Sequence, residues 1–250
     1  MVLKDKLNWA DQLAVRETGI LKERALIESG KAERSTYYFH VGSAVFYAIE
    51  VYVVRGGKRS RQAWQMVIDA VLAYFYGEWR TSQATPEGKI GHQAWKPYCL
   101  WYDEVQQSLP FAAALSNWEA MKRIAEYPPE NKLPEAGKAK GETAWGWALV
   151  SFLRGQPRSR VEEFLQKAED DEAKRPKLLA PVLRALLDND AVEFNSTLTA
   201  YLAYYRKREF KQRLGQLVTL EGTTLYHLGR KQGFEIELPE NVADHVLRLE

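Results

Sequence analysis

Residues 61–76 read RQAWQMVIDAVLAYFY. The large apolar side chains of this segment recur at i, i+3, i+4, i+7, i+8 and i+11, a spacing that places them on one face of an α-helix. We therefore expect a helix that buries this face in a core. The apolar positions are Trp64, Val67, Ile68, Val71, Leu72 and Phe75.

The same helical period continues through the rest of the chain, and the alternation typical of strands is scarce. We predict an all-α fold of irregularly stacked antiparallel helical hairpins, with about ten or eleven helices. The clearest repeats of the period are Val161, Phe164, Leu165 and Ala168, and then Phe194, Leu198, Tyr201, Leu202 and Tyr205.

Signals for helix ends accompany these apolar stripes. Ser159 with Glu162, and Asp190 with Glu193, have the spacing of a capping box, in which a side-chain oxygen and a carboxylate satisfy the first free amides of a helix. Glycines that follow an apolar stripe predict helix C-termini. They are Gly56, Gly57, Gly77, Gly155 and Gly233.

The C-terminal residues predict one extended piece and a last helix. The sequence FEIELP, at positions 234–239, alternates apolar and acidic side chains before Pro239 ends the run. We expect one short extended arm that lies on the helices. A final helix should follow from about Glu240 to Leu249, with Val242 and Val246 on its buried face.

One long break interrupts the helical pattern. Residues 127–141 read YPPENKLPEAGKAKG and contain three prolines. Loops of this length also occur within one domain, so we predict a single all-helical domain over residues 1–250. A division into residues 1–126 and 142–250 around this proline-rich loop is the alternative.

Composition narrows the class of protein. The 35 Lys and Arg residues nearly cancel the 33 Asp and Glu residues, which leaves a formal net charge of +2 and argues against a nucleic-acid-binding protein. The most apolar segment, SAVFYAIEVYVV at positions 43–54, has about half the length that a bilayer requires. Because it also contains Glu50, we predict a central buried helix there and a cytoplasmic protein without membrane contact.

The usual catalytic motifs are missing from the sequence. It has no H-E-x-x-H pair for zinc, no glycine-rich phosphate loop and no G-x-S-x-G nucleophile elbow. We therefore predict no cofactor and no metal. The single cysteine, Cys99, has no base nearby and is interpreted as a buried apolar residue. The four histidines, His40, His92, His227 and His245, are far apart; for His40 and His227 we expect hydrogen bonds within the packing.

Glu221 is the one carboxylate that the helical phase places on a packed face. It takes the i+7 position of the stripe that includes Leu214, Leu217, Val218 and Leu225. We favour a structural ion pair with an arginine of a neighbouring helix. The alternative is a proton donor or acceptor in a cleft, because perturbed carboxylates gather at active sites.

Charged clusters remain as candidate binding surfaces. An acidic run could meet a basic partner, where opposite charges speed encounter; a solvated face is the alternative. Its members are Glu162, Glu163, Glu169, Asp170, Asp171 and Glu172. Two basic clusters are interpreted as helix-end and solubility features, without the interleaved aromatic rings that single-stranded nucleic acid requires. They are Arg55, Lys58, Arg59 and Arg61, and Arg206, Lys207, Arg208, Lys211 and Arg213.

The C-terminal part of the chain resembles a known family. The segment 177–209, KLLAPVLRALLDNDAVEFNSTLTAYLAYYRKRE, precedes LVTLEGTTLYHLGRKQGFEIEL at 217–238 and a proline. This order is similar to the immunity protein 49 family of bacterial polymorphic toxin systems. The matching positions are Asp190, Phe194, Leu198, Leu228, Gly229, Arg230, Gly233 and Pro239.

The resemblance implies a non-catalytic immunity protein, or antitoxin, that binds a cognate toxin, often a nuclease, and occludes its active site. It brings no catalytic residues with it, and its expected partner is the toxin protein alone. Two other interpretations stay open. One is a generic helical scaffold or regulator that binds a protein in a groove, and the other is an enzyme with a helical core that uses Glu221.

Overall fold

The computed structural model describes residues 9–32, 34–76, 100–127, 135, 138–139, 141–208 and 217–249. Eleven α-helices, one 3-10 turn and no strand form within these residues, so the predicted all-α class is confirmed. The elements are α1 (Trp9–Glu28), α2 (Arg34–Arg55), η1 (Gly57–Arg59), α3 (Arg61–Tyr76), α4 (Leu100–Ala114), α5 (Trp118–Glu126), α6 (Gly141–Leu153), α7 (Arg158–Glu169), α8 (Lys174–Leu187), α9 (Ala191–Arg208), α10 (Leu220–Lys231) and α11 (Glu240–Ala243).

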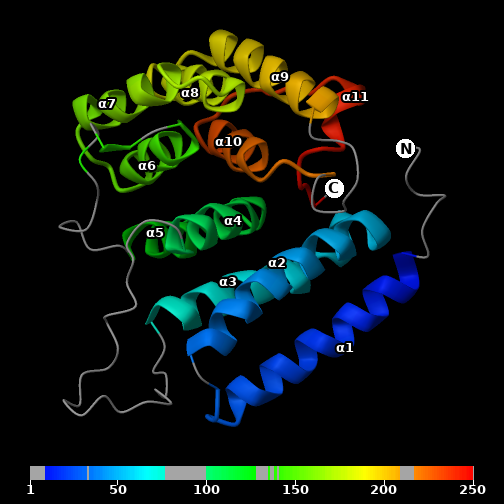
Figure 1. Cartoon of the computed structure of the whole chain (residues 1–250). Helices are drawn as coiled ribbons and strands as arrows, with labels where there is room; N and C mark the ends of the chain where they lie inside the picture. Colours follow the sequence, from blue (N-terminus) through cyan, green and yellow to red (C-terminus); the bar gives the residue numbers. More distant parts are fainter. Residues whose placement is uncertain are drawn as a thin grey trace, which may run out of the picture.

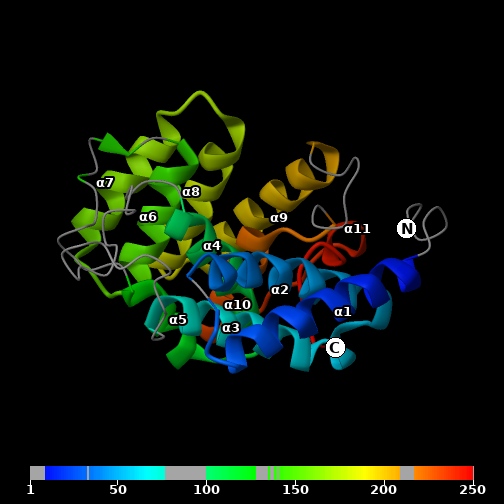
Figure 2. The same cartoon turned by 60° about the horizontal axis from the view of Figure 1, so that its bottom comes forward.

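Consecutive helices pack against one another as a stack of hairpins. Helices α1, α2 and α3 form one end of the molecule, and α7, α8 and α9 form the other, with α4, α5, α6 and α10 between them (Figure 1). Helix α10 leaves the sequential order and packs against α4 as well as α8 and α9. Figure 2 shows α10 close to α4 from a second direction. A late helix therefore joins α8 and α9 to the middle of the stack.

One connected cluster of buried side chains runs from Leu13 to Leu247 and crosses both sides of the proline-rich stretch. The stripe of α3 lies at its centre, because Trp64 is fully buried and its ring lies near those of Tyr52 and Phe111. The stripes predicted for α7 and α9 are buried as well.

Of the two predicted helix N-caps, one is correct and one is wrong. Oδ1 of Asp190 accepts hydrogen bonds from the amides of Val192 and Glu193, both at 3.0 Å, which confirms it as the cap of α9. Ser159 is not a cap, since α7 already begins at Arg158 and Pro157 precedes it. The fixed φ of a proline suits the entry to a helix, so the chain turns into α7 before the serine.

The stripe that began at Leu214 is also wrong. Helix α10 begins at Leu220, and Oγ1 of Thr219 accepts a hydrogen bond from the amide of Gly222 at 3.1 Å. A capped N-terminus at this point cannot continue a helix from Leu214, which itself lies outside the described residues. Glu221 therefore belongs to the first turn of α10.

The C-terminus is less helical than predicted. Helix α11 spans only Glu240–Ala243, and Val246 and Leu247 that follow are both fully buried. The amide of Leu247 donates to Oγ1 of Thr223 at 3.1 Å, which ties the chain to α10 instead of to a further helical turn. The extended arm at 234–238 is confirmed, with Phe234 buried.

Helix α2 contains the most apolar segment. By length and composition alone, Thr36–Arg55 would suffice to cross a membrane, but 56% of its most apolar window is buried in the fold, as in the core helix of a soluble protein. Glu50 of this helix is 4% exposed and accepts a hydrogen bond from Nε of Arg16 at 2.8 Å. The prediction of a helix that is mostly buried is confirmed, but this helix lies at one end of the stack, between α1 and α3, and Phe46 on it is 50% exposed.

Several predictions concern residues outside the described part of the chain. They are the buried state of Cys99, the helix end at Gly77, the surroundings of His92, most of the loop 127–141, and Lys211 and Arg213 of the second basic cluster.

Candidate binding surface

The predicted acidic run is engaged mostly within the protein itself. Nη1 and Nη2 of Arg184, on α8, lie 2.5 and 3.1 Å from the two carboxylate oxygens of Glu169. Nε of the same arginine donates to Glu162 at 3.0 Å. The hydrogen bond with Glu169 raises the pKa of Arg184. This arginine therefore pairs with two members of the run and joins α7 to α8.

The other members of the run differ in how much charge they leave available. Glu163 pairs with Arg160 at 3.1 Å, and Asp170 accepts a hydrogen bond from Gln166. Asp171 accepts the amide of Ala173 at 2.8 Å. Among the residues that the structure describes, Glu172 has no partner and is exposed. The proposal that this run binds a basic partner stays a prediction, with a smaller free charge than the sequence indicates.

Glu221 forms the structural ion pair that its position favoured. Nη2 of Arg175, on α8, lies 2.5 Å from Oε1 of Glu221. Oε2 lies 3.4 Å from the hydroxyl groups of Tyr201 and Thr219. Burial first, and then the charge of Glu221, raise the pKa of Tyr201. The carboxylate thus links α8, α9 and α10.

The three histidines in the described part of the chain make contacts within the packing, and none of these contacts is with Glu221. Nδ1 of His40 lies 3.1 Å from Oε2 of Glu23, and Nε2 of His227 lies 2.8 Å from the carbonyl oxygen of Leu247. His245 contacts the carbonyl oxygen of Leu217 at 2.9 Å. The expectation of hydrogen bonds within the packing is confirmed for His40 and His227. In the described part of the chain, no three His, Cys, Asp or Glu side chains gather as a metal site would require.

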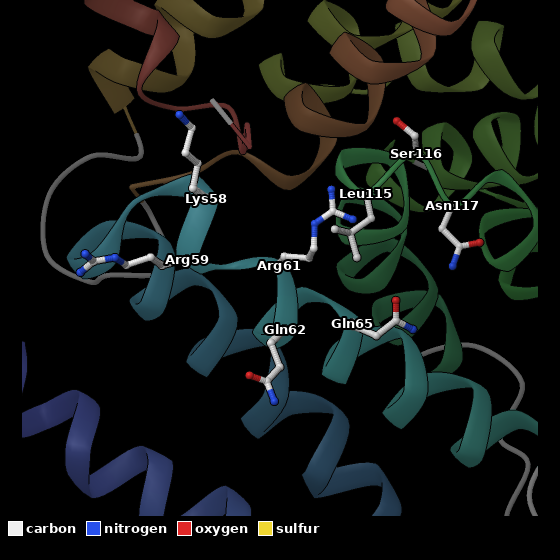
Figure 3. Close-up of a pocket in the computed structure, with 8 residues that line it drawn as sticks. All are labelled: Lys58, Arg59, Arg61, Gln62, Gln65, Leu115, Ser116 and Asn117. Atoms are coloured by element: carbon white, nitrogen blue, oxygen red, sulfur yellow. The ribbon is translucent and has the colours of Figure 1, made fainter.

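Free positive charge gathers around an open cleft of about 790 Å³ between η1, the start of α3 and the turn between α4 and α5. Lys58, Arg59 and Arg61 line it and are exposed. Within the described ranges, none of these three cations has a carboxylate or other partner. Figure 3 shows Arg61 pointing toward Leu115, and Asn117 lies across the cleft from α3. No carboxylate lines this cleft among the described residues.

A second cleft of about 460 Å³ adjoins the first, because Ser116 lines both. The C-terminal half of α10 supplies its cations, Arg230 and Lys231, and the C-terminal segment supplies Arg248. Trp118, the first residue of α5, forms part of the wall. This cleft likewise has no acidic residue in its described lining.

The C-terminal segment holds the two clefts together. Gly57 of η1 is buried, and a Cβ atom there would lie 1.8 Å from the carbonyl oxygen of Arg248. Only glycine allows this close approach. The hydroxyl of Tyr52 also donates to the carbonyl of Val246 at 3.0 Å. We call the two adjoining clefts the basic furrow.

A strained residue lies where the clefts meet. Ser116 has φ 55°, the left-handed region that favours glycine. Its amide donates to the carbonyl of Ala113, and the amide of Asn117 donates to that of Ala112, so the turn closes α4 tightly. Oδ1 of Asn117 then caps α5 by accepting the amide of Ala120. These bonds hold the furrow wall in one geometry.

The aromatic rings of the furrow are not open for stacking. Nζ of Lys231 lies 4.6 Å from the ring centroid of Trp118, and Cζ of Arg230 lies 6.0 Å from that of Tyr226. Tyr226 is also buried. The cations that would attract a nucleic acid thus cover the rings on which its bases would stack.

The positions that carry the family resemblance have structural contacts. A Cβ atom on Gly229 would lie 2.6 Å from Cε1 of Phe194, so α10 packs directly on that ring. The ring of Phe194 also meets the ring of Phe234 at 5.3 Å, and the amide of Phe234 donates to the carbonyl of Gly229. This pattern therefore describes how α9, α10 and the arm pack together.

Comparison of the chain with family models, with curated proteins and with solved structures gives no match. The class that fold and surface define is an all-helical protein with an open basic furrow, and the case for its function depends on that surface.

The sequence indicated half of the furrow. The cluster Lys58, Arg59 and Arg61 was visible as a run of cations, whereas Arg55 of the same run pairs with Glu17 at 3.4 Å. No local signal joined this run to Ser116 or Lys231, because those residues come from the turn before α5 and the end of α10. Only the folded structure shows that Lys58, Arg59 and Arg61 have no partner among the described residues and that the serine between the clefts has a positive φ.

Proposed function

We propose that the protein is a non-catalytic immunity protein that binds and inhibits a cognate bacterial toxin in the cytoplasm. The observation that carries the proposal is the distribution of charge. Glu50 and Glu221, which are buried or nearly so, each pair with an arginine, whereas Lys58, Arg59 and Arg61 line an open cleft and have no partner among the described residues.

The rigidity of this surface supports a role in tight binding. The furrow is built from helix ends and a closed turn, so little backbone freedom is lost when a partner docks. Slow dissociation from a toxin benefits from such a preorganised surface. The resemblance of the C-terminal part to immunity proteins is the reason for proposing a toxin as the partner.

The enzyme interpretation has less support. A carboxylate in general acid–base catalysis needs access to substrate and a partner that tunes its proton affinity. Glu221 has a side chain only 13% exposed and lies against Arg175 and Tyr201, and it lines neither of the two clefts described above. This arrangement favours a structural role for Glu221.

Co-expression with the product of the neighbouring toxin gene tests the proposal. We expect growth arrest by the toxin alone, growth when this protein is present, and co-purification of the two proteins. A catalytically dead toxin variant should still co-purify, which separates binding from effects on toxin expression. Growth arrest that this protein fails to relieve would overturn the immunity proposal. A partner gene that encodes no toxin would instead favour the scaffold or regulator.

A further inference from the structure

We propose that the basic furrow binds a carboxylate-rich segment of the partner protein; this inference rests on the proposed function and specifies where and how the partner is recognised. The first cleft presents Lys58, Arg59 and Arg61 without competing carboxylates in the described lining. Asp and Glu side chains of a partner would supply the carboxylates with which these cations can pair. Charge-assisted hydrogen bonds of this kind are among the stronger polar contacts.

The furrow suits a peptide segment better than a small anion. The first cleft alone measures about 790 Å³, which exceeds the space that one phosphate or sulfate fills, and Ser116 also lines the second cleft of about 460 Å³. Each cleft combines cations with an apolar side chain, since Leu115 lines the first cleft and Trp118 the second. A segment that contains both acidic and apolar side chains matches this mixture of surface groups.

The furrow also favours a protein over a nucleic acid. Single-stranded nucleic acids need open aromatic faces on which bases stack, and here Lys231 covers a face of Trp118. The amide side chains of Gln62, Gln65 and Asn117 line the first cleft and offer both donors and acceptors. Peptide backbone groups use both of these, whereas phosphates only accept hydrogen bonds.

The test uses the purified full-length chain and a labelled poly-glutamate peptide as the probe. The furrow variant is Lys58→Glu with Arg61→Glu, and the matched control is Lys22→Glu with Lys177→Glu, two exposed cations on α1 and α8 that lie outside both clefts. All four positions are exposed, and a Glu at Arg61, the first residue of α3, is favourable near a helix N-terminus. Circular dichroism and thermal unfolding check that both variants fold.

We expect the wild type and the control to bind poly-glutamate, and the furrow variant to bind at least about tenfold more weakly. The charge-conserving variant Lys58→Arg with Arg61→Lys should retain most of the binding. Added salt should weaken binding, because the cleft is open to solvent. Equal affinity of the furrow variant and the control, or no binding by the wild type, would overturn the inference.

Two further arms separate this inference from its alternatives. Tighter binding of single-stranded DNA than of poly-glutamate, lost in the furrow variant, would overturn the protein segment in favour of a nucleic acid. In the toxin co-expression assay, rescue by the wild type but not by the furrow variant supports both proposals. Undiminished rescue by the furrow variant overturns the furrow as the partner surface and leaves the immunity function standing.

Discussion

Arg175 and Glu221 are 46 positions apart in the chain, yet Nη2 of the arginine lies 2.5 Å from Oε1 of the glutamate. This ion pair joins α8 to the first turn of α10, and α10 in turn packs against α4. The carboxylate that the sequence singled out for chemistry therefore helps to hold the middle of the stack together.

Removal of one partner from this pair should destabilise the protein. Arg175→Ala leaves the carboxylate of Glu221 beside Tyr201 without its counter-charge, and we expect a loss of about 2 to 3 kcal/mol in the free energy of unfolding. Urea unfolding followed by circular dichroism measures this loss. The control Arg24→Ala breaks the exposed pair with Glu28 and should cost less than about 1 kcal/mol. Equal losses in the two variants would contradict the structural role.

Gly229 should not tolerate a side chain. In Gly229→Ala the new Cβ would lie 2.6 Å from the ring of Phe194 and 2.9 Å from Cδ1 of Ile236, and such overpacking costs about 1 to 3 kcal/mol. The matched control is Gly42→Ala in α2, where a Cβ meets nothing within 4 Å. Because alanine is the better helix former, the control should gain about 0.5 to 1 kcal/mol. Chemical denaturation of both variants measures whether the free energy of unfolding falls in Gly229→Ala and rises in Gly42→Ala.

The acidic run should divide into structural and dispensable members. Glu169→Lys places a cation against Arg184 and should destabilise the fold by at least about 1 kcal/mol. Asp170→Lys combined with Glu172→Lys, both at exposed positions, should change stability by no more than about 0.5 kcal/mol. The stable double variant then tests the run as a partner surface. Weaker toxin binding by this variant would support the acidic run, and unchanged affinity would dismiss it.

Tyr47 should make stability depend on alkaline pH. Burial, together with the hydrogen bond to Glu17 at 2.8 Å, raises the pKa of Tyr47 from 10.0 to about 12. Because the folded state holds this proton more tightly than the unfolded state, the contribution is complete below pH 10 and is lost as the pH rises toward about 12. The stability difference between the wild type and Tyr47→Phe should therefore shrink across this range. A difference that stays constant in urea titrations on both sides of pH 10 would refute the assignment.

Relief of backbone strain at the junction of the furrow should stabilise the protein. Ser116→Gly removes the Cβ from a residue with φ 55° and should raise the free energy of unfolding by about 0.5 to 1 kcal/mol. Thermal unfolding detects the change. Ser116→Ala keeps the Cβ and serves as the control, since it should show no such gain. A gain of the same size in both variants would mean that the hydroxyl, not the backbone, carries the cost.

Local patterns in the chain were sufficient for the helices and for most of their buried faces. The stripe from Trp64 to Phe75 and the cap at Asp190 depend on neighbours within about one or two turns, so periodicity and capping chemistry predict them directly. The same locality explains the failures. The sequence shows apolar spacing at Leu214 and Val246. The start of α10 is set by Thr219, which accepts the amide of Gly222, and the amide of Leu247 donates to Thr223 of α10 instead of continuing a helix.

Long-range packing decided which charged side chains have an ion-pair partner and which do not. Glu162, Glu169 and Glu221 are charged residues in sequence, yet each pairs with Arg184 or Arg175 because the fold brings α8 beside α7 and α10. Lys58 and Arg61 look like ordinary helix-end cations until the turn at Ser116 and the end of α10 close a furrow beside them. Ion pairing depends on the distance in space between two charged groups, and the separation of two residues in the sequence does not give that distance.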